Sequence, residues 1–381
     1  MGLSAAIVGA GPAGLYLAYL LRRNGVARHV RVFEQNPANA TYGFGVVFSE
    51  RALHFLNDGS KSLVDEIAGA TENWSGQDIS VNGTTVPVDA GKAFAIERLR
   101  LLEILQKHCL EAGAEIEFNS RLETLEDLQE FDVIVGADGA NSIVRNAHVD
   151  RFQPTLTEYT NRFAWYGTHT RYAVNALTFL RTEHGAFCGH HYRYKPDMST
   201  FVAECDEAAW IGHGMDSMDE EERRKFSEDI FASVLDAPLI SNRSLWNPWR
   251  IVSNERWHYS NTVLIGDASR TAHPSIGSGT RLAMEDSIFL CRALAVGYDD
   301  VPTALAAYEA ERRPIREKLN KAARLSIEWY ERMGQHLELA PYDFVHSFLV
   351  RTRRMTPERL YREMPAFMRA YDNINSVASN G

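Results

Sequence analysis

Residues 6–15 read Ala6-Ile7-Val8-Gly9-Ala10-Gly11-Pro12-Ala13-Gly14-Leu15, and this stretch decides the fold. An apolar run rich in β-branched residues ends at Gly9, and a helical pattern starts near Pro12. In a strand, turn and helix of this kind, the first glycine allows the tight turn, the second lets the backbone approach a pyrophosphate, and the third lets the helix pack on the strand. The free N–H groups at the helix start favour phosphate. The stretch therefore predicts the first unit of a dinucleotide-binding fold.

A second predicted strand, at residues 29–34, strengthens this interpretation. It ends at Glu34, about twenty residues beyond the glycines, where an acidic residue usually binds ribose hydroxyls. Gln35 follows it directly. A glycine turn without a ligand is the alternative that this pattern leaves open.

Predicted strands alternate with helices through much of the chain, which is typical of an α/β protein with a doubly wound parallel sheet. From about residue 154 the pattern changes to strands with few helices between them, and from residue 302 it is helical, with a break or kink expected at Pro314. We therefore expect three parts: a Rossmann-like nucleotide-binding domain (residues 1–75, 92–153 and 255–300), an inserted β-rich substrate domain (residues 76–91 and 154–254) and C-terminal helices (residues 301–381).

Composition excludes several classes of function. The formal net charge of −10 argues against a nucleic-acid partner. The four cysteines form no CxxC pair, which suits a reducing cytoplasm and argues against a zinc site or a disulfide framework. No apolar run reaches the roughly 18 residues of a membrane span, and the N-terminal stretch lacks the basic leader of a signal peptide. We expect a cytoplasmic protein without a metal site.

Two further motifs accompany the glycine turn. Residues 132–145 contain Asp138-Gly139, and residues 266–280 read Gly-Asp-Ala-Ser-Arg-Thr-Ala-His-Pro-Ser-Ile-Gly-Ser-Gly-Thr. In this order and spacing, the three motifs resemble those of the group A FAD-dependent aromatic hydroxylases, the p-hydroxybenzoate hydroxylase-like monooxygenases. Residues 41–49 and 271–286 are most similar to the branch that contains salicylyl-CoA 5-hydroxylase and 2-aminobenzoyl-CoA monooxygenase.

The resemblance implies a single-component FAD-dependent monooxygenase. Such an enzyme uses NADH or NADPH, bound transiently, and dioxygen to hydroxylate an aromatic ring through a C4a-hydroperoxyflavin. The narrower resemblance implies that the small aromatic substrate is an aryl-CoA thioester such as salicylyl-CoA. The first domain would then be the FAD-binding domain.

The resemblance and the motif chemistry together name the expected site residues. His273 and Pro274, in the turn near the flavin, are the expected catalytic residues. Phe44, Val46, His191 and Tyr192 are expected to contact the substrate, and His169, His190 and His213 are further candidates for that contact. Cations for CoA phosphates would come from Arg312, Arg313, Lys318, Arg351, Arg353 and Arg354. The expected FAD-binding residues are Gly9, Gly11, Pro12, Ala13, Gly14, Glu34, Gln35, Arg98, Asp138, Gly266, Asp267, Gly277, Gly279 and Thr280.

Three other functions stay open at this point. The substrate can be a free aromatic acid or an amino acid such as tryptophan, because only the substrate pocket would differ. A flavin-dependent halogenase is disfavoured by residues 246–251, Trp-Asn-Pro-Trp-Arg-Ile, which lack the WxWxIP spacing. A flavin-binding protein without turnover is the alternative from outside the enzyme class, and NAD(P)H oxidation with an aromatic ligand discriminates against it.

Overall fold

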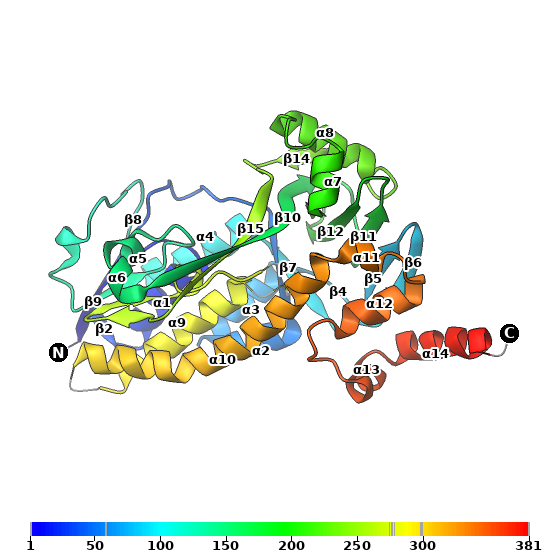
Figure 1. Ribbon diagram of the computed structural model, residues 1–381. Coiled ribbons are helices and arrows are strands. Elements are labelled where there is room, and N and C mark those ends of the chain that lie inside the picture. Colours follow the sequence, from blue (N-terminus) through cyan, green and yellow to red (C-terminus); the bar gives the residue numbers. More distant parts are fainter. Residues whose placement is uncertain are drawn as a thin grey trace.

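The computed structural model describes residues 2–57, 59–273, 275, 277, 279–297 and 300–379. A six-stranded sheet in the order β16-β17-β9-β1-β2-β8 forms the centre of the N-terminal part (Figure 1). Its strands are parallel except for β16, which pairs antiparallel with β17. The strands are β1 (Leu3–Val8), β2 (Ala27–Phe33), β8 (Glu115–Glu117), β9 (Val133–Gly136), β16 (His258–Tyr259) and β17 (Thr262–Leu264).

Three helices pack together on the main apolar core of this sheet. Helix α1 (Pro12–Arg23) follows the glycine turn, and ten of its twelve residues are buried. It lies against α4 (Arg98–Glu111) and α9 (Gly279–Ala295). Burial on nearly all sides explains why α1 is apolar around most of its circumference. The parallel sheet with flanking helices confirms the predicted α/β class.

An eight-stranded sheet forms the second body of the molecule. Its order is β14-β10-β13-β12-β11-β5-β6, and β15 pairs with β10. The 15-residue strand β10 bridges the two regions: its first half pairs only with β15, and its second half joins β13 and β14. The strands are β5 (Gln77–Val81), β6 (Thr84–Val88), β10 (Pro154–Thr168), β11 (Asn175–Arg181), β12 (Ala186–Lys195), β13 (Met198–Cys205), β14 (Leu239–Ser241) and β15 (Asn247–Asn254).

The hairpin β5–β6 enters this sheet from a distant part of the sequence. Asn82 and Gly83 form its two-residue turn with φ angles of +48° and +87°. Positive φ at both positions suits a turn that follows the twist of the strands, and Asn-Gly adopts it readily. Strand β5 then pairs in parallel with β11, which places residues 77–88 in the same sheet as β10–β15.

A small third sheet, β3-β7-β4, connects the two bodies. Gly45 begins β3, and a Cβ atom built there would lie 2.6 Å from the Tyr194 Cβ, so only glycine fits against β12. Ser49 caps the following helix by accepting a hydrogen bond from the Ala52 N–H at 3.3 Å. The elements of this part are β3 (Gly45–Ser49), α2 (Glu50–Asn57), α3 (Lys61–Gly69), β4 (Glu72–Trp74) and β7 (Ala93–Glu97).

Helices cover both faces of the eight-stranded sheet (Figure 1). Helices α7 (Glu207–Gly212) and α8 (Glu220–Ile230) lie on one face. On the other, α12 (Pro341–Val350) and α14 (Pro365–Ser379) contact the β5–β6 hairpin. The remaining helices are η1 (Glu126–Leu128), α5 (Ile143–Ala147), α6 (Val149–Phe152), η2 (Gly266–Ala268), α11 (Met333–His336) and α13 (Pro357–Glu363). In the described part of the chain, every helix is too short or too polar to cross a membrane.

A break or a kink was expected at Pro314, and the long helix α10 (Val301–Tyr330) continues through this residue without a break. Proline removes one backbone hydrogen bond and disfavours the helix locally. Two buried arginines hold the helix on either side of it: Arg312 binds Asp286 and Arg316 donates to the Arg270 carbonyl.

Candidate active site

The three glycines of the N-terminal turn differ in what surrounds them. Gly9 has φ +105°, and an added Cβ would lie 2.5 Å from the Ala137 carbonyl oxygen. An added Cβ at Gly14 would lie 2.0 Å from the Gly9 carbonyl oxygen. At Gly11, by contrast, no protein atom lies within 4 Å of the added Cβ. Packing within the protein therefore requires two of the glycines, while Gly11 leaves the backbone open to a group from outside, as a pyrophosphate needs.

The Glu34 carboxylate lies beside this turn. Its Oε2 accepts a hydrogen bond from the Ala10 N–H at 2.9 Å, and its Oε1 accepts one from the Asn36 N–H at 2.9 Å. These bonds fix the carboxylate at the carboxyl end of β2, next to the start of α1. Gln35 is exposed at the same edge, while Pro12 and Ala13 are buried in the first turn of α1.

Asp138 orders the segment after β9. Its Oδ2 accepts hydrogen bonds from the N–H groups of Ile143 at 2.7 Å and Val144 at 3.3 Å, while its buried Oδ1 has no partner among the described residues. Burial raises the pKa of this carboxyl group. An added Cβ at Gly9 would lie 2.9 Å from the Asp138 Cα, so this motif supports the glycine turn from behind.

Arg98, Asp267 and Tyr192 come from three distant segments and meet close to one another. The Arg98 N–H donates to the Phe44 carbonyl, and the Tyr192 hydroxyl donates to the Gly45 carbonyl at 2.8 Å. Burial lowers the pKa of the Arg98 guanidinium, and the charges of Asp267 and Tyr192 oppose that shift.

Asp267 has the complementary environment. Burial raises the pKa of its carboxyl group, and the charges of Arg316 and Arg98 oppose that shift. The Asp267 side chain is nevertheless exposed, and the Arg98 side chain is only half-buried. Charged groups that are surrounded by protein yet reach solvent are typical of a ligand site. The residues therefore fit an FAD molecule with its phosphates near Arg98.

The turn after η2 approaches the same region. Gly277 has φ +56°, and an added Cβ there would meet no atom within 4 Å. Gly279 and Thr280 begin α9, so the turn ends in a helix N-terminus with little side-chain bulk. Gly266 donates its N–H to Asp286 at 3.0 Å, which anchors the turn to α9. The expected catalytic residue Pro274 lies outside the described residues.

Arg312 and Arg351 were expected to bind CoA phosphates, and the structure corrects both assignments. Arg312 is fully buried and donates to Asp286 at 2.7 Å and to Glu285 at 2.9 Å. Arg351 donates to the Ser275 carbonyl at 2.8 Å, and its guanidinium lies 3.7 Å from the centre of the Phe348 ring. Both arginines therefore hold protein segments in place.

The other four expected cations are at or near the surface. Arg313 forms an ion pair with Glu309 and lies over the Trp257 ring. Lys318, Arg353 and Arg354 are exposed. Among the described residues, no interaction brings these four cations together. The structure therefore assigns them no common phosphate site.

His273 is buried in the turn, with 4% of its surface exposed. Its Nδ1 accepts a hydrogen bond from the Ser275 N–H at 3.1 Å, and its ring lies 4.9 Å from that of Trp249. Burial lowers its pKa to about 4, against the opposing charge of Glu204. The imidazole is therefore neutral near pH 7.

Glu204, a buried carboxylate on β13, was not predicted from the sequence. Its Oε1 accepts a hydrogen bond from Asn161 at 2.9 Å, and its Oε2 lies 3.4 Å from the His190 Nε2. Burial alone would raise the pKa of Glu204, but His190, His273 and Asn161 hold it below its usual value. The signal that could have found it is a lone acid in the apolar run 201–205.

His191 and Tyr192, both expected to contact the substrate, lie on opposite faces of the eight-stranded sheet. Tyr192 shares its face with His190. His191 stacks on Phe201 at 5.4 Å, bonds Thr178 at 3.0 Å and belongs to the face that α7 and α8 cover. Successive strand residues alternate between faces, so these neighbours cannot both reach one site. The assignment of His191 is therefore corrected to that of a core residue.

The remaining expected contacts also separate. Phe44 packs with Trp74, Tyr194 and Met198 between the two bodies and lines a pocket there. Val46 is buried in the main core of the six-stranded sheet, so a direct substrate contact is not supported. His169 is exposed and bonds the Asp197 carbonyl, and His213 bonds Thr182, so neither joins the group around Glu204.

A protein-family model described as "FAD binding domain" matches residues 3–133 and 130–323. The chain belongs to this FAD-binding family. Salicyloyl-CoA 5-hydroxylase of Streptomyces sp is 35% identical over 363 residues, which span 92% of this chain and 70% of that protein. The 3-hydroxy-4-methyl-anthranilyl-[aryl-carrier protein] 5-monooxygenase of Streptosporangium sibiricum is 34% identical over 328 residues, which span 85% of this chain and 88% of that protein.

A solved structure of 2-methyl-3-hydroxypyridine-5-carboxylic acid oxygenase shares the fold. Its TM-score is 0.72 at 18% identity, with 94% of this chain and 96% of that chain covered. The family match and the named relatives together show that the protein is an FAD-dependent monooxygenase of the aromatic hydroxylase type. FAD is its cofactor, as the three motifs predicted.

Proposed function

We propose that this FAD-dependent monooxygenase hydroxylates an aromatic ring that is carried as a thioester of CoA, with NADH or NADPH as the reductant. Two relatives that are more than 30% identical are named for acyl groups on CoA or on an aryl-carrier protein. Bound FAD supplies the redox chemistry with dioxygen. The protein supplies the binding of both partners and the charges around them.

FAD would be held by residues from all three motifs. Gly11 and the N-terminus of α1 would take the pyrophosphate, Glu34 the ribose, and Arg98 a phosphate. Asp267 would accept hydrogen bonds from the ribityl hydroxyls. The N-terminus of α9 would stabilise negative charge on the reduced ring.

The observation that carries the proposal is the buried carboxylate of Glu204 beside His273. An aromatic ring is hydroxylated more readily when an attached hydroxyl or amino group donates electrons to it. A charged carboxylate held by His190 and Asn161 can accept the hydrogen bond of such a group and take its proton. His190 and Tyr192 lie on the same face of β12, so they would flank the ring.

The test is the variant Glu204→Gln, with the exposed Glu207→Gln as its control. We expect Glu204→Gln to retain FAD and to lower kcat on the thioester about 100-fold, because a positioned base contributes at least that much. In the wild type we expect kcat to rise with pH as the Glu204 carboxyl group loses its proton. This rise should be absent from the pH profile of Glu204→Gln. An unchanged pH profile and kcat would refute the role of Glu204.

Substrate class is tested separately with the wild-type enzyme. We expect a higher kcat/KM for salicyloyl-CoA than for salicylate. Equal values would favour hydroxylation of a free aromatic acid, which is the second candidate function.

A further inference from the structure

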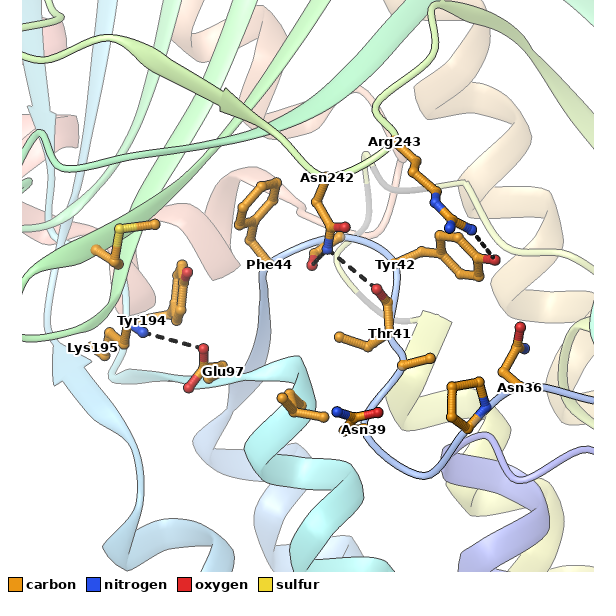
Figure 2. Close-up of a pocket in the computed structure, with 15 residues that line it drawn as sticks. Asn36, Asn39, Thr41, Tyr42, Phe44, Glu97, Tyr194, Lys195, Asn242 and Arg243 are labelled. Carbon is orange, nitrogen blue, oxygen red and sulfur yellow. Dashed lines mark hydrogen bonds and ion pairs between the residues drawn. The ribbon is translucent and has the colours of Figure 1, made fainter. Parts of the chain in front are cut away.

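A pocket of about 560 Å³ opens between the loop of residues 36–44 and the eight-stranded sheet. Figure 2 shows its lining, in which Tyr42 and Arg243 lie together on one side and Lys195 and Glu97 on the other. Amide side chains of Asn39 and Asn242 complete the polar part. A lining with several polar side chains, three aromatic rings and two cations suits an anionic ligand that also carries a flat ring.

Arg243 is the cation that the pocket leaves available. Lys195 forms an ion pair with Glu97 at 3.2 Å, whereas Arg243 has no carboxylate partner among the described residues. Its side chain is exposed, and its Nη1 lies 3.4 Å from the Tyr42 hydroxyl. The Arg243 backbone has φ +55°, which costs a non-glycine residue about 1 kcal/mol, so the surrounding structure must hold it there.

Tyr42 offers a ring on which a base can stack. More than half of its side chain, 53%, is exposed, although tyrosine in a folded protein is usually half-buried or more. The loop that carries it is fixed by Asn242, whose Nδ2 donates to the carbonyls of Thr41 at 3.2 Å and Gly43 at 3.4 Å. The ring is therefore presented by an ordered loop, with the Arg243 guanidinium 5.9 Å from the ring centre and within hydrogen-bond distance of the ring hydroxyl.

The pocket adjoins the proposed active site. Phe44 and Tyr194 line it, and both belong to an apolar cluster against which Tyr192 packs. Arg98 bonds the Phe44 carbonyl and directly precedes Leu99, another residue of the pocket wall. A ligand in the pocket would thus be separated from the aromatic site only by the wall that these side chains form.

We propose that this pocket binds the adenosine diphosphate group of a reaction partner. Arg243 would pair with the diphosphate, for which a guanidinium is well suited, and Tyr42 would stack on the adenine. This inference deepens the proposed function, on which it rests: the group belongs either to the CoA thioester or to NAD(P)H, which share the same chemistry.

Binding is tested by titrating the FAD-loaded enzyme with ADP in a calorimeter. We expect wild-type binding, and a loss of about tenfold in affinity for both Arg243→Ala and Tyr42→Ala. Arg121→Ala, which removes an exposed arginine paired with Glu123, should bind ADP as the wild type does. Absence of ADP binding in the wild type, or equal affinity in all four proteins, would overturn the proposal.

Kinetics then identify the source of the group. If Arg243→Ala raises the KM for salicyloyl-CoA and leaves the KM for NADH unchanged, the pocket binds the thioester. If it raises the KM for NADH and leaves that for salicyloyl-CoA unchanged, the pocket binds the reductant. If no thioester is hydroxylated but ADP binding still depends on Arg243, the proposed function fails and the pocket stands. If thioesters are hydroxylated and ADP binding ignores Arg243, the pocket assignment fails alone.

Discussion

Gly11 and Gly14, both in the first turn, differ in whether the protein leaves room for the methyl group of an alanine. The Gly14 methyl would collide with the Gly9 carbonyl at 2.0 Å, whereas the Gly11 methyl would meet no protein atom within 4 Å. The requirement at Gly14 is internal packing. Packing sets no such requirement at Gly11, and we propose that the cofactor does.

We expect Gly11→Ala to fold normally and to bind FAD weakly. Its backbone, at φ −75° and ψ 177°, suits alanine, so stability without FAD should change by less than about 1 kcal/mol. Gly14→Ala should instead lose about 1–3 kcal/mol of unfolding free energy, because the helix must move from the strand. Urea unfolding of both FAD-free variants and FAD titration give the comparison. Full FAD affinity in Gly11→Ala would contradict the account.

His191 gives a prediction about pH. Burial lowers its pKa to about 3, whereas the ordinary value, which applies to the unfolded chain, is 6.5. Below pH 6.5 the unfolded chain takes up a proton that the folded protein excludes, so stability is complete above 6.5 and falls as the pH falls. The loss from this residue is about 2 kcal/mol between pH 6.5 and pH 5.

Unfolding at these two pH values should therefore show a smaller acid loss in His191→Gln than in the wild type. The exposed His169→Gln serves as control and should match the wild type. Because His191 faces away from the proposed active site, its variant should also keep the wild-type kcat. An equal loss of stability with acid in His191→Gln and the wild type, or a large loss of kcat in His191→Gln, would show that His191 is not a buried residue remote from the active site.

For single residues, the sequence was informative where the local backbone geometry determines which residue type is possible. The turn geometry and packing expected of Gly9 and Gly14 agree with the structure, because those roles depend on a few bonds of backbone. The assignment of His191 failed because the face of a strand residue depends on register, which is set by distant partners. Glu204 escaped notice because its partners, Asn161 and His190, lie on other strands.

At the scale of elements, helices α9 and α10 are joined by a buried ion network. Arg312 lies between Asp286 and Glu285, and Asp286 also accepts the Gly266 N–H. Removal of one partner from such a network leaves buried charge uncompensated. The network therefore links the turn of the flavin site to the long C-terminal helix.

Arg312→Met should destabilise the protein by about 3–5 kcal/mol, because each of two buried carboxylates loses its shortest ion pair and keeps only Arg281 or the more distant Arg316. FAD affinity should fall as well, since the Gly266 turn depends on Asp286. Lys318→Met, at an exposed position of the same helix, should change neither quantity. Thermal unfolding and FAD titration measure both effects, and an Arg312→Met variant as stable as the wild type would contradict the role of the network.

Local signals also account for several elements. The positive φ angles of Asn82 and Gly83 explain the hairpin at residues 77–88, and Gly279 stands at the start of α9. The parallel pairing of β5 with β11 could not be predicted, since no short segment specifies it. Of the break or kink expected at Pro314, the break is absent, because buried arginines on both sides outweigh the lost hydrogen bond.

On the scale of the whole molecule, the site forms where two sheets and the C-terminal helices meet. Arg98 begins α4, Asp267 follows the six-stranded sheet, and Tyr192 and Glu204 belong to the eight-stranded sheet. Arg351, after α12, bonds the turn that carries His273 through Ser275. The sequence motifs indicated the cofactor and the class of enzyme, but the side chains of the proposed active site come together only through this arrangement.

The most direct test of the central claim is the fate of dioxygen during turnover. The FAD-loaded enzyme would be given salicyloyl-CoA, NADH and isotopically labelled dioxygen, and the product analysed by mass spectrometry. The account predicts one labelled oxygen atom in the aromatic ring of the thioester for each NADH oxidised. NADH oxidation that leaves every aromatic ligand without labelled oxygen would contradict it.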